Sequence, residues 1–234
     1  MVEKIVELKN ISKKYSETES PVIKNLSLNL YCGKLYFVCG PSGVGKSTLL
    51  HIIGLMDKPS DGEYYLFGNK IEYSSQDKLS KLRIENVGFM FQFHYLIENL
   101  TVEENILLPY WMKNKIVNKT KASSLDFVKY LGLENLLSRY PYEISGGEQQ
   151  RVSLARAIIN KPKIILADEP TGNLDYKNAI KMIEMIKDIV NMYNVTVLIA
   201  THNIELTKYG DVIINLKDGQ VDTIEGDEKL VTKE

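Results

Sequence analysis

Residues 40–47 read Gly-Pro-Ser-Gly-Val-Gly-Lys-Ser, a complete G-x-x-x-x-G-K-S phosphate-binding loop. Such a loop needs a buried strand before it and a helix after it, because its backbone N–H groups and the positive end of the helix must converge on phosphate oxygens. The sequence provides both, since residues 35–39 are continuously apolar and a helix is expected from near Lys46. A chance glycine-rich turn would lack these neighbours. The loop therefore predicts an α/β fold that binds a nucleoside triphosphate.

Four short segments are continuously apolar, namely residues 35–39, 87–91, 164–167 and 195–200. Strands of this kind are typical of a parallel sheet that helices cover on both faces. Polar or glycine residues follow each segment; in chain order they are Gly40, Gln92, Asp168 with Glu169, and Thr201 with His202. Ligands of open parallel sheets bind at the carboxyl ends of the strands. The pattern therefore predicts an active site along one edge of the sheet.

The other segments show two further patterns. In the first third of the chain, apolar and polar residues alternate, as in an antiparallel sheet with one solvent-exposed face. Residues 93–161 are helical in pattern and include a capping box over 101–104 and an amphipathic stretch over 119–131. We therefore expect one domain, in which residues 1–92 and 162–234 form a nucleotide-binding core with an antiparallel flank. Residues 93–161 form an inserted helical subdomain.

The charge and hydropathy of the chain limit the kinds of molecule that it is expected to bind. The formal net charge of −1 over 234 residues argues against a broad basic surface for nucleic acid. No apolar run approaches the roughly 20 residues of a membrane helix, and the N-terminus opens into a charged alternating segment without the pattern of a signal peptide. We expect no nucleic-acid binding and no direct membrane insertion, so that any link to a membrane comes through a partner.

Residues of the two nucleotide motifs have defined chemical roles. Lys46 is placed to bridge the β- and γ-phosphates, and the Ser47 hydroxyl to bind Mg²⁺. Residues 164–168 form an apolar strand that ends in Asp168, a carboxylate that can hold Mg²⁺ through water. Glu169 comes next and is the natural general base for the attacking water. In another sequence the two acids could be a solvated pair at a strand end, but the phosphate-binding loop makes a hydrolase site the better interpretation.

A second glycine-containing segment, Ser145-Gly146-Gly147-Glu148, opens another expected helix. Ser145 and Glu148 have the spacing of a capping box, which by itself is structural. Two glycines at a helix start are unfavourable, because glycine costs about 1 kcal/mol relative to alanine within a helix. They leave a bare, electropositive backbone that an anion can approach. The chain already has one phosphate cradle, so this second one is best explained if it faces a γ-phosphate held by another copy.

With these motifs in this order, the chain resembles the ATP-binding cassette (ABC) ATPases over nearly its whole length. The resemblance implies an α/β, RecA-like P-loop core with a mostly parallel sheet, an antiparallel β subdomain and an inserted α-helical subdomain. It implies ATP and Mg²⁺ as cofactors, and a second copy of the chain with which two ATP molecules are bound head to tail. The chain's signature segment ends in Glu148, where the family usually has Gln.

The resemblance also implies roles for single residues. Tyr15 matches the residue that stacks on adenine, Gln92 the residue that senses Mg²⁺ and the transport subunit, and His202 the histidine that contacts the γ-phosphate. The implied catalytic residues are Glu169, His202 and Lys46. The implied nucleotide-binding residues are Tyr15, Gly40, Ser42, Gly43, Gly45, Lys46, Ser47, Thr48, Gln92, Ser145, Gly147 and Asp175. The implied metal ligands are Ser47, Gln92 and Asp168. His51 and His94 have no such match and are interpreted as packing residues.

Two stretches, residues 91–109 and 166–175, narrow the resemblance to one branch of the family. This branch contains lipoprotein-releasing ATPases, macrolide exporters of the MacB type and cell-division ATPases of the FtsE type, and the first stretch is most similar to the lipoprotein-releasing group. The resemblance implies a peripheral subunit at the cytoplasmic face of the inner (plasma) membrane that drives release of lipoproteins. A drug or peptide exporter and a regulator of cell-wall enzymes without transport activity remain open.

Residues 109–112, Pro-Tyr-Trp-Met, place the only tryptophan of the chain beside other large apolar side chains. Trp111 could fill the core of the helical subdomain. Aromatic and methionine side chains that gather on a surface mark interfaces. We therefore expect an integral membrane transport subunit to dock near residues 92–112.

Overall fold

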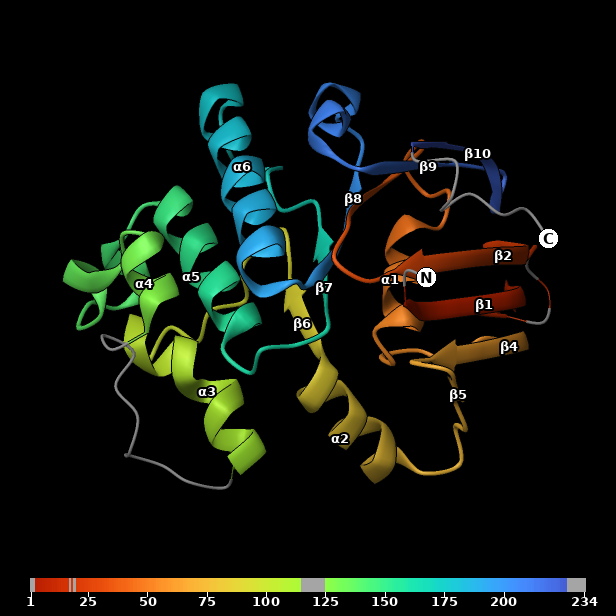
Figure 1. Cartoon of the computed structure of the whole chain (residues 1–234), viewed down its shortest axis with the longest axis horizontal. Coiled ribbons are helices and arrows are strands. Elements are labelled where there is room, and N and C mark those ends of the chain that lie inside the picture. The colour runs from red at the N-terminus through yellow and green to blue at the C-terminus, as the bar shows by residue number, and fades with distance from the viewer. Residues whose placement is uncertain (1–2, 17, 19, 115–124, 227–234) are drawn as a thin grey trace.

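The strands form two sheets. The predicted site lies at the carboxyl ends of the parallel strands of the larger sheet and in the loops that follow them. The computed structural model describes residues 3–16, 18, 20–114 and 125–226. Within these residues, a six-stranded sheet has the order β10-β9-β3-β8-β7-β6 and a four-stranded sheet the order β2-β1-β4-β5 (Figure 1). The strands of the larger sheet are β3 (Leu35–Cys39), β6 (Val87–Met90), β7 (Ile164–Asp168), β8 (Thr196–Thr201), β9 (Val212–Lys217) and β10 (Gln220–Gly226). Those of the smaller sheet are β1 (Lys4–Lys13), β2 (Ile23–Tyr31), β4 (Asp61–Leu66) and β5 (Asn69–Lys70).

Pairing within the sheets confirms the predicted fold class. From β9 to β6 every neighbouring pair in the larger sheet is parallel, and only β10 runs antiparallel to its neighbour. The smaller sheet is antiparallel throughout. In β2, side chains alternate between buried and less buried positions, as expected of a sheet with one wetter face. The four continuously apolar segments of the sequence correspond to β3, β6, β7 and β8.

The helices that surround the sheets are α1 (Lys46–Ile53), α2 (Gln76–Asn86), α3 (Val102–Asn114), α4 (Asp126–Tyr130), α5 (Gly146–Ile158) and α6 (Tyr176–Tyr193). Short 3-10 helices cover Glu134–Leu136, Pro141–Glu143 and Ile204–Tyr209. The predicted capping box is present at the start of α3, where the Thr101 N–H donates to Glu104 Oε2 at 2.8 Å. Of the amphipathic stretch expected over 119–131, residues 119–124 lie outside the described residues, and the helical part that is described is α4.

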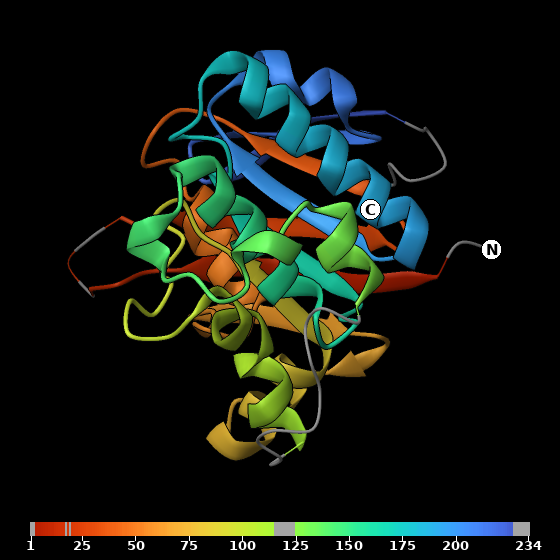
Figure 2. The ribbon, with the colours of Figure 1, turned by 90° about the vertical axis from the view of Figure 1, so that its left-hand side faces the viewer.

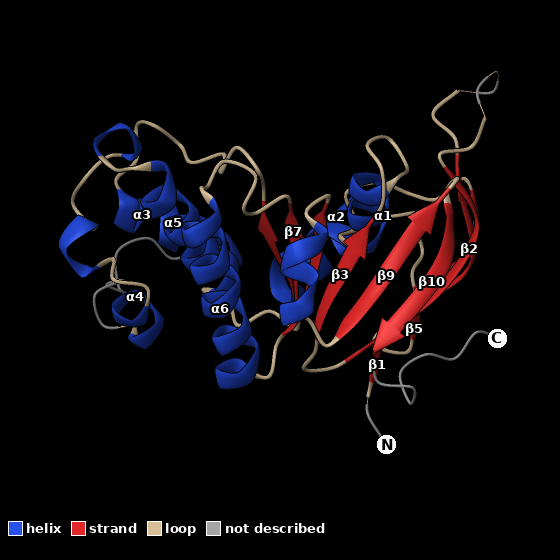
Figure 3. Ribbon diagram, turned by 90° about the horizontal axis from the view of Figure 1, so that it is seen from above, coloured by secondary structure: helices blue, strands red, loops and turns tan. Residues whose placement is uncertain are grey.

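Successive side chains of a parallel strand point to opposite faces of the larger sheet, and this divides the core into two layers. Leu35, Phe37 and Cys39 of β3 belong to a buried cluster with the apolar faces of α5 and α6. Tyr36 and Val38 point to the other face, into a cluster with α1 and the antiparallel sheet. Figure 3 shows this order, with the helices of the first cluster on one side of the larger sheet and α1 between the two sheets. Helices that begin at the two glycine-containing motifs therefore pack on opposite faces of one sheet.

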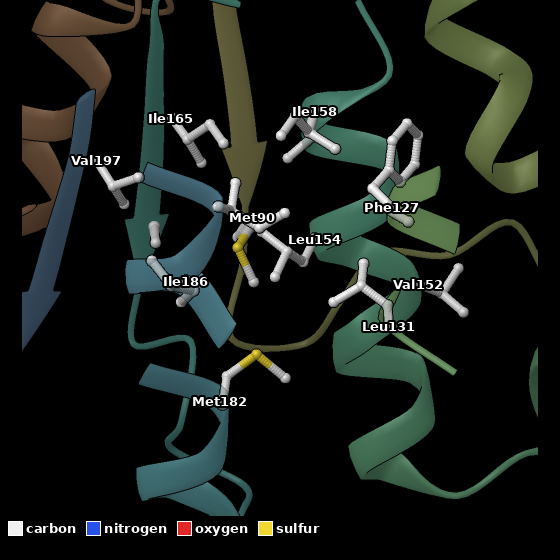
Figure 4. Close-up of a cluster of buried hydrophobic side chains, with 14 of the residues drawn as sticks. Met90, Phe127, Leu131, Val152, Leu154, Ile158, Ile165, Met182, Ile186 and Val197 are labelled. Carbon is white, nitrogen blue, oxygen red and sulfur yellow. The ribbon is translucent and has the colours of Figure 1, made fainter. Parts of the chain in front are cut away.

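On its helical side the larger sheet is tightly packed. Leu154 and Ile158 of α5 point toward Met90 of β6 and Ile165 of β7 (Figure 4). Gly88 of β6 permits this close approach, because a Cβ atom at that position would lie 2.3 Å from the Ala157 carbonyl oxygen. Since β6 leads to Gln92, this packing ties α5 to the segment that carries one of the predicted site residues.

Residues 93–161 supply the helices α3, α4 and α5, which gather on one side of the larger sheet (Figure 2). Proline occurs inside α3, where the Pro109 carbonyl oxygen accepts a hydrogen bond from Asn160 Nδ2 at 3.0 Å. Across the described ranges, none of the helices has both the length and the apolar character needed to span a bilayer.

Candidate active site

The phosphate-binding loop joins β3 to α1 and is shaped by glycines. Gly40, Gly43 and Gly45 all have positive φ angles, of 152°, 79° and 108°. A Cβ atom on Gly43 would meet nothing within 4 Å, so the backbone there is open to an incoming group. Lys46 begins α1 and is buried, and its Nζ donates to the carbonyl oxygens of Gly40 and Pro41 at 2.8 and 3.0 Å. The loop therefore curls around the ammonium that is predicted to meet the phosphates.

Hydroxyl residues of the phosphate-binding loop and of the first turn of α1 differ in burial. Ser42 in the loop and Ser47 on the helix are exposed. Thr48 is buried, and its Oγ1 shares a hydrogen bond of 3.2 Å with the Tyr15 hydroxyl. Tyr15 remains 58% exposed. The structure thus joins the predicted adenine-stacking residue to the helix that begins at the phosphate-binding loop.

Glu169 is held by the last residue of the neighbouring strand β8, Thr201, and by the residue that follows it, His202. Its backbone is in the left-handed region, with φ of 47°, which is uncommon for a residue other than glycine and is found at functional sites. Oε2 accepts from Thr201 Oγ1 at 3.2 Å, and Oε1 accepts from the backbone N–H of His202 at 3.0 Å. The His202 Nδ1 lies 2.8 Å from the same Oε1. The strand ends that the sequence predicted to meet do so here.

Asp168 ends β7 and stands opposite Ala200 of β8 in the parallel register. Gln92 follows β6 and contacts the segment after Glu169: its carbonyl oxygen accepts from Asn173 Nδ2 at 3.0 Å. A Cβ atom on Gly172 would lie 3.2 Å from the Gln92 side-chain nitrogen, so glycine lets these two segments approach. The structure therefore brings Gln92, Asp168 and Glu169 to neighbouring strand ends of one sheet.

The capping box at the second glycine motif is present. The Ser145 N–H donates to Glu148 Oε2 at 2.7 Å, and the Glu148 N–H donates to Ser145 Oγ at 3.4 Å. Hydrogen bonds from Ser145 hold the pKa of the Glu148 carboxyl below its usual value, and the Arg151 charge lowers the pKa further. A Cβ atom on Gly146 would meet nothing within 4 Å. Glu148 thus turns back to its own helix cap and leaves an open backbone at Gly146.

Ser145 and Gly147 are not placed with the chain's own phosphate-binding loop. Helix α5, which they open, packs in the cluster on one face of the larger sheet, whereas α1 packs in the cluster on the other face. Asp175, the remaining predicted nucleotide-binding residue, caps α6, where its Oδ1 accepts from the Asn178 N–H at 3.1 Å. That hydrogen bond lowers the pKa of Asp175, which is exposed.

Four residues to which the sequence analysis gave no individual role support the site. Thr201 and Asn173 bond to Glu169 and Gln92 as described above. Arg156 of α5 donates to the carbonyl oxygens of His94 and Tyr95. Asn105 is fully buried, and its Nδ2 donates to the carbonyl oxygens of Ile97, Leu100 and Thr101, each at 3.0 Å. The hydrogen bonds of Thr201, Asn173 and Arg156 join segments that are distant in the chain, and those of Asn105 depend on the shape of the loop before α3, so no local sequence pattern signals them.

His51 and His94, which the sequence analysis interpreted as packing residues, differ in how far they are buried. His94 is 7% exposed, in keeping with a packing role, and burial lowers the pKa of its ring. His51 is half-buried near the end of α1.

Oxygen ligands at the loop fit Mg²⁺, which prefers hard oxygen donors and usually keeps several waters and substrate phosphates as ligands. The candidate donors are the exposed hydroxyl of Ser47, the carboxylate of Asp168 and the side-chain oxygen of Gln92. Among the residues that the structure describes, no cluster of three or more His, Cys, Asp or Glu side chains could hold a metal by itself. The site therefore suits a cation that arrives with a phosphate ligand.

A groove of about 1480 Å³ lies beside the Gln92 segment. Its lining includes Phe91, Tyr95, Pro109, Met112, Lys113 and Arg156, together with residues of α2. Met112 is 64% exposed. Trp111 was expected on this surface, but its side chain packs against the buried cluster of α5 and α6, and its Nε1 is buried. Trp111 is half-buried, so its packing favours the core interpretation, and the exposed side chain of this stretch is Met112.

Residues 23–172, more than half of the chain, match the family described as ABC transporter. The lipoprotein-releasing system ATP-binding protein LolD of Aquifex aeolicus is 41% identical over 217 residues, which cover 93% of this chain and 96% of that protein. An uncharacterized ABC transporter ATP-binding protein of Methanocaldococcus jannaschii is 41% identical over 232 residues, which cover 97% of each chain. The macrolide export ATP-binding/permease protein MacB of Haemophilus ducreyi is 40% identical over 225 residues, which cover 94% of this chain and 32% of MacB.

A solved structure shows the same fold. It is the dimeric, post-hydrolysis state of an ATP-binding cassette bound to ADP and Pi, and it aligns with a TM-score of 0.85 at 39% identity. The alignment covers 97% of this chain and all of that one.

Proposed function

Because this chain belongs to the ABC transporter family, we propose that it is the ATPase subunit of a transporter that releases lipoproteins from a membrane. The coarser statement, an ATP-hydrolysing ABC transporter subunit that dimerises, follows from the family match and from the dimeric cassette of similar fold. The observation that carries the finer proposal is similarity to LolD proteins along nearly their whole length. The second candidate, macrolide export, is favoured by the similarity to MacB at the same level of identity.

Binding of ATP is proposed to begin at Tyr15 and the phosphate-binding loop. Adenine stacks on the exposed face of Tyr15, while the loop N–H groups and the helix α1 N-terminus bind the phosphates. The Lys46 ammonium then leaves the carbonyl oxygens of its own loop and bridges the β- and γ-phosphates. When bound, Mg²⁺ supplies charge neutralisation at the phosphate oxygens, and Ser47, Gln92 and Asp168 are the residues proposed to hold it.

Glu169 is proposed to accept the proton from the attacking water, which it can do only if its carboxylate is fixed and close. Thr201 and His202 provide that fixation through three hydrogen bonds. His202 is largely exposed, with 67% of its side chain accessible, so its ring is free to meet the γ-phosphate when nucleotide is bound. Hydrolysis then leaves ADP and inorganic phosphate in the site.

The site is proposed to be completed by the second copy. Ser145 and Gly147 of that copy face the γ-phosphate, since the open backbone at the α5 N-terminus suits an anion. Asp175 lies on the segment between Glu169 and α6 and is proposed to contact the partner's site. ATP thus holds two copies together, and its hydrolysis lets them separate.

Closure of the dimer is proposed to act on a membrane subunit seated in the groove beside Gln92. The helical subdomain, residues 93–161, supplies one wall of this groove through α3 and α5, and α2 supplies the other. Arg156 joins α5 to the backbone after Gln92, so movement at the signature segment reaches the groove through direct hydrogen bonds. The chain is then a peripheral subunit at the cytoplasmic face of the membrane.

A detergent pull-down of the tagged Glu169→Gln protein with Mg-ATP tests the finer proposal. Recovery of a four-span subunit that has a large extracytoplasmic domain and carries a bound lipoprotein supports lipoprotein release. Recovery of the same architecture with export components moves the function to efflux, and recovery with activators of wall enzymes moves it to regulation. Recovery of no membrane protein contradicts the transport role.

A further inference from the structure

Lys13 is a nearly buried cation beside the tyrosine that we propose stacks on adenine. Only 8% of Lys13 is exposed. Its Nζ lies 2.6 Å from Asp57 Oδ1 and donates to the Lys58 carbonyl oxygen at 2.9 Å. The same nitrogen lies 4.8 Å from the centroid of the Tyr15 ring. A buried ammonium is unfavourable unless it is paired, and here a carboxylate, a carbonyl oxygen and an aromatic ring surround it.

The ion pair connects two elements that are far apart in the chain. Lys13 ends β1, and its carbonyl oxygen accepts from the Val22 N–H at 2.8 Å. Asp57 follows α1, and its N–H donates to the His51 carbonyl oxygen at 3.2 Å. Lys13 thus fixes the end of β1 to the carboxyl end of the helix that begins at the phosphate-binding loop.

Tyr15 is therefore linked directly to the first turn of α1 and, through Lys13, to Asp57 in the segment that follows the helix. Its hydroxyl bonds to Thr48 on the first turn, and its ring lies under the ammonium that Asp57 holds beyond the last turn. Despite these contacts the residue is 58% exposed. The hydroxyl and one ring face are occupied, so the other face is the surface left for a nucleotide base.

We propose that Lys13 is a positioning residue for ATP: it holds the Tyr15 ring so that the base platform and the phosphate-binding loop keep one fixed separation. This inference rests on the proposed role of Tyr15 in stacking on adenine. The proposal separates binding of the base from binding of the phosphates. Lys13 acts on the base through Tyr15, and it has no contact with the phosphate-binding loop among the interactions described above.

Lys13→Met tests this division, because it keeps the apolar stem and removes the ammonium. We expect the Kd for Mg-ATP, measured by titration calorimetry, to rise by about 3- to 10-fold, the range of a cation–π contact. The Kd for Mg-tripolyphosphate, which has no base, should not change. In steady-state hydrolysis the effect should appear in KM rather than in kcat. Lys13→Arg should restore most of the affinity, and Lys14→Met, at an exposed neighbouring lysine, is the matched control.

A double variant with Tyr15→Ala decides whether Lys13 acts through the ring. If it does, Lys13→Met adds no further loss of ATP affinity in the Tyr15→Ala background. Equal losses for ATP and tripolyphosphate, or a full additional loss in that background, would overturn the proposal. Should Lys13→Met fail to fold, Asp57→Asn tests the same contact with the same two affinities. Failure of the unmodified protein to bind Mg-ATP at all would instead contradict the proposed function.

Discussion

His202 binds Glu169 Oε1 twice: the backbone N–H donates at 3.0 Å, and Nδ1 lies 2.8 Å away. A carboxylate oxygen only accepts, so Nδ1 carries a hydrogen in this contact. A carboxylate has about four acceptor positions, two on each oxygen. His202 fills both positions on Oε1, and Thr201 fills one on Oε2. The remaining position on Oε2 is the one with which we propose that Glu169 takes a proton from water.

Glu169→Gln should bind Mg-ATP but hydrolyse it on the order of 10²- to 10⁴-fold more slowly, because the amide cannot accept the proton. It should accumulate as a dimer with ATP, because we propose that the second copy is released only after hydrolysis. Phosphate release and size-exclusion chromatography measure the two effects. Glu205→Gln, at an exposed glutamate after His202, is the matched control. Full turnover by Glu169→Gln would remove Glu169 from the role of base.

Lys46→Met should weaken Mg-ATP binding by roughly 10- to 100-fold, the equivalent of about 1.5–3 kcal/mol for a hydrogen bond to a charged group. The variant keeps an apolar stem in the buried position and loses only the donor. Titration with Mg-ATP measures the change, and Lys181→Met on the exposed surface of α6 serves as control. Unchanged affinity would show that the loop N–H groups alone bind the phosphates.

Met112→Glu should prevent the membrane subunit from binding while leaving Mg-ATP affinity unchanged, because a carboxylate would enter the groove beside Gln92. Met192→Glu is the control, since Met192 is a similarly exposed methionine on α6 that does not line the groove. Co-purification in detergent measures the binding. Equal recovery of the partner with both variants would place the docking surface elsewhere.

Local sequence patterns were sufficient for four strands of the larger sheet, and they also supplied the candidate reactive residues, whose roles stay predictions. The continuous apolar runs located β3, β6, β7 and β8, because strands buried on both faces need no polar residues. Each run also ended beside the polar residue that the fold brings to the sheet edge. The order of the strands in the larger sheet could not be predicted, because segments distant in the chain, such as β3 and β9, become neighbours.

Contacts between distant segments account for what the sequence missed. Trp111 and Met112 are adjacent, and only the packing of α3 against α5 decides which one faces the core. Lys13 and Asp57 are separated by 44 positions, and nothing in the local pattern around either residue indicates the ion pair. Motifs therefore supplied the candidate reactive groups, whereas the groups that hold them in place became visible only in the fold.

Glu148→Gln should make protein stability less dependent on pH on the acidic side. The folded protein holds the Glu148 pKa below its ordinary value of 4.5, so its charge stabilises the fold above that pH. This contribution is lost as the pH falls below 4.5 and through the folded pKa. Urea unfolding at a series of pH values measures the free energy of unfolding, which should fall less steeply with decreasing pH in the variant than in the unmodified protein. Parallel curves for both proteins would show that the Ser145 cap does not favour the charged carboxyl.

Gly88→Ala should separate β6 from α5, because the added Cβ would meet the Ala157 carbonyl oxygen at 2.3 Å. Overpacking of this kind costs about 1–3 kcal/mol, and each kcal/mol lowers the Tm of a chain of this size by roughly 2–4 °C. Gly146→Ala is the matched control for stability, since a Cβ there meets nothing within 4 Å and should not lower the Tm. An unchanged Tm for Gly88→Ala would mean that α5 can shift on the sheet at little cost. The Gly88 contact would then not fix α5 to the Gln92 segment, and the Arg156 hydrogen bonds would be the connection between them.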